Sequence, residues 1–436
     1  MLKSILTNLG GQRILWIEQS RSMAVAEVLR RVSASDYAKL RGCRAAVAVR
    51  PSAEVLVTLV SLDGICRDIL LMPDSTTPRQ RELLLREFGA EILIEGRKAK
   101  FLKYGGFNSG GHEGTTFATR WVIPTSGTTG APKFVSHTFR SLTKTMKAKQ
   151  LEAPLRWGLL YDLSRFAGLQ VFLSCLLSGS PLILTDEALP LSARLELLQE
   201  HDCTALSATP SMWRKILMIP CSQHLQLRQI TLGGEIADQK VLDALHSRYA
   251  NARMVHIYAS TEAGACFSVK DGLAGFPVAY ITNPPEGVDL KVTDDRLLWI
   301  RPSTHDQQYL NSDTNLFDAD GFINTGDLVV KSGDRYYFVG RANGSINVGG
   351  DKVHPEEVEA ALLTFSCVQQ ARVYAKNNAF LGAVVAADVV VDTANFSRDH
   401  LLKELARMLP PYKIPATLNI VSDLELSSAG KKIRLQ

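Results

Sequence analysis

The chain has 436 residues, of which 46% are hydrophobic and 21% charged, and its formal net charge is +5. This length predicts about two or three domains, and the composition excludes a disordered chain. Lysine and arginine are spread along the sequence, which argues against nucleic-acid binding, and no apolar run is long enough to span a membrane. The seven cysteines and nine histidines lack CxxC and HExxH spacings, and the N-terminus lacks a signal peptide. We therefore expect a cytoplasmic protein without a metal cluster.

The first hundred residues alternate between helix and strand patterns. Apolar residues at helical spacing predict helices over 23–32, 52–64 and 77–88. Ser52 is a plausible N-cap of the second. Short apolar runs predict strands over 44–49, 68–73 and 91–94. Such alternation is typical of a mainly parallel sheet covered by helices.

A segment dense in hydroxyls and glycines follows the apolar run 121–124. Its residues are Thr125, Ser126, Gly127, Thr128, Thr129, Gly130, Ala131, Pro132 and Lys133. Glycine lets the backbone approach a ligand closely, the hydroxyls are hydrogen-bond donors, and the lysine adds a positive charge. The spacing is not that of a Walker A loop. Taken alone, the segment fits either a polyphosphate cradle or a polar surface turn.

The alternation of helices and strands resumes after this segment. We expect helices over 141–150 and 191–201, and strands over 204–208 and 229–232. The apolar run that begins near Val171 predicts a buried helix followed by a strand over 181–184. These elements continue the α/β pattern of the first hundred residues.

Further segments have the composition of ligand-binding turns. They are Gly233-Gly234-Glu235, Tyr258-Ala259-Ser260-Thr261-Glu262, Thr325-Gly326-Asp327, and Gly430-Lys431, with Arg341 beside a domain boundary. Taken singly, each has an ordinary explanation, such as a tight turn, a core aromatic, a solvated carboxylate or a charged tail. Their order along the chain and their flanking residues favour one shared ligand site.

The pattern changes beyond about residue 284. Short strands over 290–292, 296–300, 322–323 and 335–339 predict an antiparallel meander. We place the domain boundary after Arg341, which gives an N-terminal domain over 1–341 and a C-terminal domain over 342–436. Within the second, helices are expected over 355–364 and 398–408, and strands over 371–374 and 381–390. The predicted fold is therefore α/β: mainly parallel sheets covered by helices, a small antiparallel barrel-like part, and a small α+β domain.

Five segments, in order, resemble the core motifs of the adenylate-forming superfamily. They are 125–133, 258–262, 325–327, 340–350 with 353–359, and 411–434. This superfamily contains acyl- and aryl-CoA synthetases, nonribosomal peptide synthetase adenylation domains and firefly luciferase. The resemblance implies an enzyme that uses ATP and Mg²⁺ to convert a carboxylic acid to an acyl-adenylate, and then passes the acyl group to a thiol. It also implies a C-terminal domain that is mobile between the two half-reactions.

The resemblance implies a role for each motif residue. The segment from Thr125 to Lys133 would hold the β- and γ-phosphates, Thr261 would contact phosphate, and Glu262 would hold Mg²⁺. Adenine would be framed by Gly233, Gly234, Glu235, Tyr258 and Ala259, with Tyr258 stacking on it. Asp327 would accept the ribose hydroxyls, supported by Arg341. Lys431 would bridge the substrate carboxylate and the α-phosphate, because a compact ammonium fits between two oxyanions. Asn343 would be the hinge, where the superfamily usually has Asp or Lys.

The sequence leaves the acid open. Arg165, Phe166 and Gly168 are candidate pocket residues, and Arg165 stands at or near the usual histidine position, where it could meet a carboxylate or a phosphate or have a structural role. Apolar surroundings that include Ala259 and Ala263 favour an uncharged tail. Asp162 is poorly spaced to bind a substrate ammonium, which weakens amino-acid activation.

The acceptor thiol is open as well. The main hypothesis is an acyl- or aryl-CoA ligase that uses coenzyme A. The alternative is a stand-alone enzyme that loads the phosphopantetheine of a carrier protein in trans, since no carrier domain follows Arg434. An inactive nucleotide-binding relative is disfavoured because Lys133, Glu262, Asp327 and Lys431 are all present.

Overall fold

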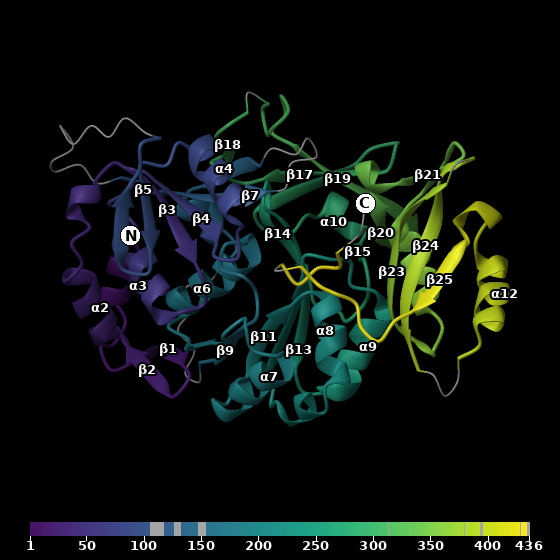
Figure 1. Ribbon diagram of the computed structural model, residues 1–436, viewed down its shortest axis with the longest axis horizontal. Helices are drawn as coiled ribbons and strands as arrows, with labels where there is room; N and C mark the ends of the chain where they lie inside the picture. Colours follow the sequence, from purple (N-terminus) through teal and green to yellow (C-terminus); the bar gives the residue numbers. More distant parts are fainter. Residues whose placement is uncertain are drawn as a thin grey trace.

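The computed structural model describes residues 1–104, 117–125, 132–146, 154–312, 314–378, 380–392, 396–427 and 429–433. Four sheets organise these residues (Figure 1). Two mainly parallel sheets with their helices form the bulk of the molecule, and an antiparallel sheet joins them to a last unit at the right of the view. The predicted fold class is confirmed.

One sheet has seven strands in the order β18-β8-β7-β4-β3-β5-β6, with β3, β4, β5 and β7 parallel. Its strands are β3 (Arg44–Val49), β4 (Asp68–Pro73), β5 (Ile92–Glu95), β6 (Lys98–Phe101), β7 (Arg120–Thr125), β8 (Lys133–His137) and β18 (Gln308–Tyr309). Its crossover helices are α3 (Ala53–Leu62) and α4 (Pro78–Phe88). Ser52 caps α3 by accepting a hydrogen bond from the Val55 amide, and Thr77 forms a capping box with Gln80 at the start of α4. The predictions for residues 44–95 are therefore confirmed.

A second sheet has eight strands in the order β14-β13-β12-β11-β9-β10-β1-β2. Its strands are β1 (Ile14–Glu18), β2 (Arg21–Ala24), β9 (Trp157–Leu159), β10 (Leu182–Leu184), β11 (Ala205–Ala208), β12 (Gln229–Gly233), β13 (Arg253–Ser260) and β14 (Gly264–Val269). All but the edge strands β2 and β14 run parallel. The associated helices are α6 (Phe166–Ser178), α7 (Leu191–Glu200), α8 (Pro210–Met218), η2 (Pro220–His224) and α9 (Gln239–Arg248).

Strands of both parallel sheets are buried on two faces, as covered parallel sheets require. One shared core contains Trp16 and Leu184 of the eight-stranded sheet, Val47 and Trp121 of the seven-stranded sheet, and Phe172 of α6. The outer face of the eight-stranded sheet packs against α7, α8 and α9, and the outer face of the seven-stranded sheet against α4. The layers are thus helix, sheet, helix, sheet, helix.

An antiparallel five-stranded sheet forms the predicted barrel-like part. Its order is β15-β20-β19-β17-β16, with β15 (Phe276–Pro277), β16 (Val288–Val292), β17 (Leu297–Pro302), β19 (Ile323–Ser332) and β20 (Arg335–Arg341). The short helix α10 (Ala279–Thr282) lies beside it. The sequence composition indicated a ligand-binding turn at 325–327, but these residues lie inside β19, where the pairing register with β17 and β20 shifts.

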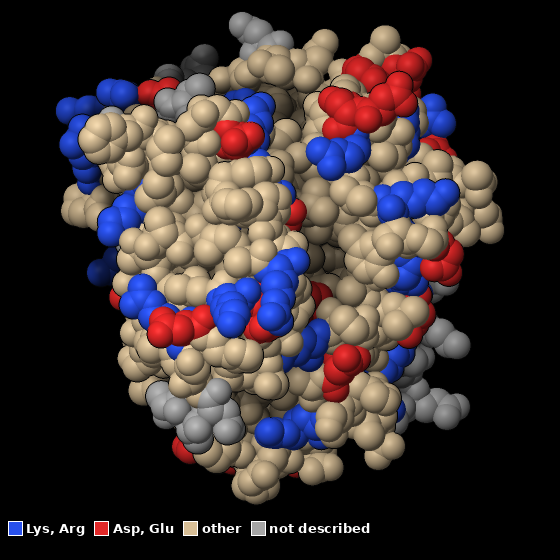
Figure 2. Space-filling model, turned by 90° about the vertical axis from the view of Figure 1, so that its right-hand side faces the viewer, with Lys and Arg blue, Asp and Glu red and all other residues tan. Residues whose placement is uncertain are grey.

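The C-terminal unit follows η3 (Ala342–Gly344). It contains β21 (Ile346–Val348), β22 (Asp351–Val353), α11 (Pro355–Leu363), β23 (Val368–Asn378), β24 (Gly382–Val391), α12 (Arg398–Met408), η5 (Pro411–Lys413) and β25 (Thr417–Ile420). Its sheet and two helices enclose a separate core. Basic and acidic side chains are interspersed on the face of the molecule shown in Figure 2.

Other differences from the sequence expectations concern helices, both in the N-terminal third and between residues 201 and 250. The helix expected over 141–150 is the shorter α5 (Phe139–Thr143), and residues 147–150 lie outside the described part of the chain. Three further elements near the N-terminus contribute to the core shared by the two parallel sheets. They are the helices α1 (Leu2–Thr7) and α2 (Val25–Ser33) and the 3-10 turn η1 (Ala38–Leu40). Of the elements described so far, α1, η1, α8 and α9 were not expected from the sequence. Across the described ranges, no helix is both long and apolar enough to cross a bilayer.

Candidate functional site

The carboxyl ends of three neighbouring parallel strands meet the C-terminal loop. Thr209 follows β11, Gly234 follows β12, and Tyr258 lies near the end of β13. The Thr209 hydroxyl donates a hydrogen bond to the carbonyl of Gly430. A β-carbon at Gly234, where φ is +84°, would lie 3.2 Å from Cε of Lys431. Carboxyl edges of parallel sheets are the usual ligand positions in α/β folds, and Lys431 lies at this one.

Glu235 links the sheet edge to the C-terminal loop. Its Oε2 accepts a hydrogen bond from the amide of Ser211 at 3.0 Å, and its Oε1 accepts one from the amide of Lys432 at 3.1 Å. Ser211 lies in the first turn of α8, which Thr209 caps by accepting from the Met212 amide. The carboxylate therefore fixes the residue next to Lys431 against the start of α8, a role the sequence did not indicate.

Further polar contacts dock the C-terminal unit on α8 and α9. Lys215 of α8 forms an ion pair with Asp423 at 2.6 Å. Lys240 of α9 donates to the carbonyls of Phe365 at 2.8 Å and Val368 at 2.7 Å. The position of Lys431 therefore depends on contacts between parts of the chain that are far apart in sequence.

The ammonium of Lys431 lies within the electrostatic reach of four charged groups. Desolvation lowers its pKa, and Arg341 and Arg165 add to this effect, whereas Glu235 and Asp327 oppose it. As a whole, the residue is nevertheless exposed to solvent. A cation placed among other cations at a solvent-accessible edge is suited to binding an anion.

Asp327, Arg341 and Tyr258 form a second cluster at this edge. The Tyr258 hydroxyl donates to Asp327 Oδ2, and Arg341 Nε lies 3.4 Å from Asp327 Oδ1. Arg341 also donates to the carbonyl of Thr325 at 2.8 Å. Burial raises the pKa of Asp327, while Tyr258, Arg341 and Lys431 act in the opposite direction. The structure thus brings together the carboxylate and the arginine that were predicted for one ligand.

The ring of Tyr258 already has aromatic neighbours. It stacks on Phe267 with a centroid distance of 5.1 Å and on Phe338 with a centroid distance of 5.0 Å. Burial and the neighbouring Asp327 carboxylate raise its pKa well above the ordinary tyrosine value. The expected stack on adenine stays a prediction, and the bond to Asp327 is an additional function of this side chain.

Thr261 and Glu262 are held by β8 and α5. The imidazole of His137 donates through Nε2 to the carbonyl of Thr261 at 2.7 Å, and burial lowers the pKa of His137 to about 4, so the ring is neutral. Lys144 Nζ donates to the carbonyl of Ala263 at 3.1 Å. These contacts fix the backbone on both sides of Glu262.

Lys133 and Glu262 both lie near Tyr309 of β18. Lys133 Nζ is 5.0 Å from the centroid of the Tyr309 ring, and burial together with the charge of Glu262 raises the pKa of Tyr309 to about 12. The sequence gave no signal for Tyr309. Residues 126–131, which include the predicted phosphate-binding Ser126, Gly127, Thr128, Thr129 and Gly130, lie outside the described part of the chain. Within the described residues, no group of three or more His, Cys, Asp or Glu side chains could hold a metal ion.

The start of α6 lies at the same sheet edge. Arg165 is the N-cap residue of this helix. Four residues earlier, the Tyr161 hydroxyl donates to the carbonyl of Gly233 at 3.3 Å. A β-carbon at Gly168 would lie 2.3 Å from the carbonyl oxygen of Asp162, so this turn requires glycine. The buried Asp162 carboxylate accepts from the Ser164 amide at 2.7 Å, so it has a structural role in the turn, and its use as a ligand for a substrate ammonium stays the weaker hypothesis.

Two other predicted residues lie at the edges of this arrangement. Phe166 packs against His137, with ring centroids 5.5 Å apart. Asn343 is exposed in η3, the turn between β20 and β21. Its position between the antiparallel sheet and the C-terminal unit is the one a hinge would occupy.

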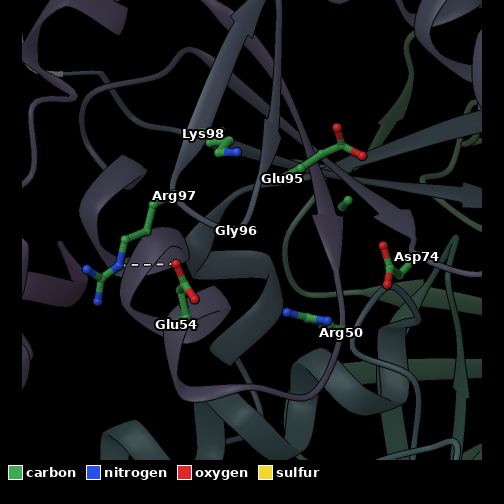
Figure 3. A pocket seen from close by; sticks show the side chains of 8 residues that line it. Arg50, Glu54, Asp74, Glu95, Gly96, Arg97 and Lys98 are labelled. Carbon is green, nitrogen blue, oxygen red and sulfur yellow. Dashed lines mark ion pairs between the residues drawn. The ribbon is translucent and has the colours of Figure 1, made fainter.

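A hollow of about 410 Å³ lies elsewhere, at the carboxyl ends of β3, β4 and β5 (Figure 3). It is lined by Ala48, Arg50, Glu54, Asp74, Glu95, Gly96, Arg97 and Lys98. Its basic and acidic side chains are equal in number, and Arg97 is paired with Glu54 at 3.1 Å. None of its charged side chains is fully buried. The hollow is open and its charges balance, so it offers a charged ligand no net attraction. It contains none of the predicted site residues.

Comparisons with known proteins match most of this chain. The model of the AMP-binding enzyme family matches residues 115–302, and that of the AMP-binding enzyme C-terminal domain matches 357–431. A D-alanine–D-alanyl carrier protein ligase of Staphylococcus aureus is 27% identical over 337 residues, which cover 72% of this chain and 69% of that protein. A 2-succinylbenzoate–CoA ligase of Listeria innocua is 26% identical over 325 residues, which cover 72% of this chain and 68% of that protein.

Solved structures share the fold over nearly the whole chain. An anthranilate CoA ligase in complex with anthranoyl-AMP superposes with a TM-score of 0.80 at 17% identity, covering 99% of this chain and 95% of the other. An o-succinylbenzoate CoA synthetase from Bacillus subtilis, in complex with its acyl-adenylate, gives a TM-score of 0.73 at 20% identity, covering 99% and 96%.

Proposed function

The chain belongs to the AMP-binding enzymes of the adenylate-forming superfamily, and from this premise we propose that it joins a carboxylic acid to a thiol with ATP as the energy source. The superfamily predicted from the motifs is thus confirmed by the family models that match 115–302 and 357–431. The proposal rests on the position of Lys431, which is held at the sheet edge beside Gly234, with Asp327 and Arg341 within electrostatic reach.

In the first half-reaction the acid carboxylate attacks the α-phosphorus of ATP and pyrophosphate leaves. Two anions must meet, so the task of the site is positioning and charge neutralisation. Lys431 would lie between the carboxylate and the α-phosphate. Asp327, oriented by Arg341, has carboxylate oxygens that can accept the ribose hydroxyls.

Glu262 and Lys133 would act on the pyrophosphate side. Both lie near Tyr309, and the backbone around Glu262 is fixed by His137 and Lys144. Glu262 would hold Mg²⁺ together with phosphate oxygens, because the described residues offer no complete set of protein ligands. The bound ion would neutralise phosphate charge.

The second half-reaction passes the acyl group to a thiol, for which we propose coenzyme A. The alternative acceptor is the phosphopantetheine of a carrier protein, and both kinds of ligase occur among the relatives. In this scheme residues 342–436 move as one domain about Asn343, which would withdraw Lys431 from the sheet edge. The few polar contacts on α8 and α9 are consistent with a reversible interface.

The direct test is ATP–pyrophosphate exchange over a panel of aryl, fatty and amino acids. We expect exchange with at least one acid, and a loss of about 10²-fold or more in Lys431→Ala, the usual cost of removing a charge-stabilising group. Lys403→Ala, an exposed lysine on α12, is the matched control and should keep full exchange. Background exchange with every acid would identify an inactive nucleotide-binding relative. Thioester formation with free CoA, compared with a holo-carrier protein, then identifies the acceptor.

A further inference from the structure

We infer that the acid activated by this enzyme carries a second anionic group, such as a second carboxylate, and that Arg165 binds it. This inference rests on the proposed function and specifies its substrate class. It starts from the position of Arg165, whose charge is close enough to Lys431 to act on the ammonium. The two cations therefore lie at the same end of the sheet.

The backbone of Arg165 is rigidly held. Its amide donates to the carbonyl of Asp162 at 3.1 Å, and its carbonyl accepts from the Leu169 amide at 3.0 Å, in the first turn of the 13-residue helix α6. The required glycine at 168 and the bond from Tyr161 to Gly233 fix the same turn to the end of β12. The fixed turn therefore anchors the base of the Arg165 side chain at the end of the sheet that holds Lys431.

Arg165 also lacks a counter-ion among the residues that the structure describes. Its Nε is buried and has no hydrogen-bond partner there. Two buried arginines do have partners: Arg335 pairs with Asp271 at 2.8 Å, and Arg194 donates to the Thr185 hydroxyl at 2.9 Å. Arg44 shares the unbonded Nε, but it lies 3.3 Å from the Asp68 carboxylate. A buried donor such as Nε is costly to leave without a partner, and a carboxylate matches the planar fork of this partly exposed guanidinium.

Two buried serine hydroxyls lie in turns at the same end of the sheet. The side chains of Ser164 and Ser211 are 0% and 3% exposed, and neither Oγ has a hydrogen-bond partner within the described part of the chain. Ser164 precedes Arg165, and the amide of Ser211 is bound by Glu235. Both hydroxyls thus belong to the turns that flank Gly233 to Glu235.

The acidic groups Glu235 and Asp327 make their contacts with residues other than Arg165. Glu235 accepts from two backbone amides, and Asp327 accepts from Tyr258 and lies beside Arg341. Lys431 is assigned to the reacting carboxylate and the α-phosphate. One fixed positive charge is then left for another part of the acid.

The residues that favoured an uncharged tail do not support it. Ala263 is fully buried in the core of the antiparallel sheet, together with Cys266 and Phe267. Ala259 packs against the core shared by the two parallel sheets. The apolar character of these positions therefore reflects packing, and it gives no information about the acid.

The test compares aliphatic and aromatic dicarboxylic acids with their monomethyl esters in ATP–pyrophosphate exchange. The wild-type enzyme should favour one or more diacids over the matched ester by about 10-fold or more in kcat/KM, as expected for a charge-assisted hydrogen bond. Arg165→Met should lower kcat/KM for that diacid by about 10- to 100-fold through KM, and should change the value for the ester and the KM for ATP by less than about 3-fold. The kcat/KM of Arg165→Lys for the diacid should lie between the values for the wild type and for Arg165→Met.

The outcomes separate this inference from the proposed function. Equal losses with diacid and ester in a folded Arg165→Met variant would mean that Arg165 serves the reacting carboxylate or ATP, and the inference would be wrong. Exchange only with acids that have uncharged tails would also overturn it, while leaving the proposed function intact. No exchange by the wild-type enzyme with any acid would overturn the proposed function itself. The thermal unfolding midpoint of each variant verifies that it is folded.

Discussion

Replacing Glu235 by glutamine should slow adenylation without slowing thioester formation. The carboxylate joins the Ser211 amide of α8 to the Lys432 amide of the C-terminal loop, at 3.0 Å and 3.1 Å. Glutamine has nearly the same shape but only one acceptor oxygen, so Glu235→Gln removes one of the two bonds and the negative charge. The docked position of Lys431 should therefore become less populated.

The size of the effect follows from the lost bond. A hydrogen bond to an ionised group contributes a net free energy of about 1.5–3 kcal/mol. Since about 1.4 kcal/mol corresponds to a factor of ten, the docked arrangement should be weakened by roughly 10- to 100-fold. If the docked and undocked arrangements have similar free energies, as alternating half-reactions require, the rate of adenylate formation should fall by a similar factor.

Two single-turnover assays separate the half-reactions. One measures acyl-adenylate formation from acid and ATP, and the other measures thioester formation from supplied acyl-adenylate and thiol. We expect a loss only in the first assay, with Glu196→Gln on α7 as a surface control. Equal slowing in both assays would refute the reasoning, and so would an unchanged rate of adenylation. A rise in the KM for ATP alone would instead support the adenine-framing role implied by the motif.

Three further predictions concern protonation and packing. Because burial lowers the pKa of Lys431, kcat/KM for adenylation should fall with rising pH below the ordinary lysine value of 10.5, and Lys431→Arg should move this fall to higher pH. His137 has a pKa of about 4 in the folded chain against 6.5 ordinarily, so the unfolded state takes up the proton first. Urea unfolding should therefore show a loss of stability of up to about 3 kcal/mol as pH falls from 6.5 to 4, reduced in His137→Gln. Gly168→Ala should lower the unfolding free energy by about 1–3 kcal/mol or more, because the new β-carbon would meet the Asp162 carbonyl at 2.3 Å, whereas Gly10→Ala has open space.

Each of these predictions can fail clearly. If kcat/KM falls at the same high pH in Lys431→Arg and in the wild type, the titrating group is not Lys431. The same acid sensitivity in His137→Gln and the wild type would show that His137 is protonated in the folded protein or that other groups dominate. Equal unfolding free energies for the Gly168→Ala and Gly10→Ala variants would mean that the turn before α6 relaxes easily.

Local signals in the sequence identified most helices and many strands. Ser52 was recognisable as a cap because capping depends on residues only three positions apart. Pairing between distant strands has no such local signal. For this reason the sequence did not show that 325–327 lies inside β19, where partners on both sides determine the extent of the strand.

The candidate site could be predicted in part for the same reason. Asp327, Arg341 and Lys431 were recognisable from motifs, and the structure brings them together. Glu235 as a link to the C-terminal loop, and Tyr309 beside Lys133, depend on contacts across long stretches of chain. Such contacts arise only from the tertiary fold.

The pairing of β1 with β10 has a consequence for how this protein folds and what endangers it. Residues 14–18 complete a sheet whose neighbouring strand comes from residues 182–184, so this edge cannot close until most of the first half of the chain has been synthesised. Until then the apolar residues Leu15, Trp16 and Ile17 of β1, all buried in the folded protein, lack their partner strand. Conversely, without β1 the buried residues Leu182, Ile183 and Leu184 would form an unprotected apolar edge. Loss of β1 would leave that edge open permanently, a known route to edge-to-edge aggregation. The first strand therefore protects the folding chain as well as completing the sheet that carries the site.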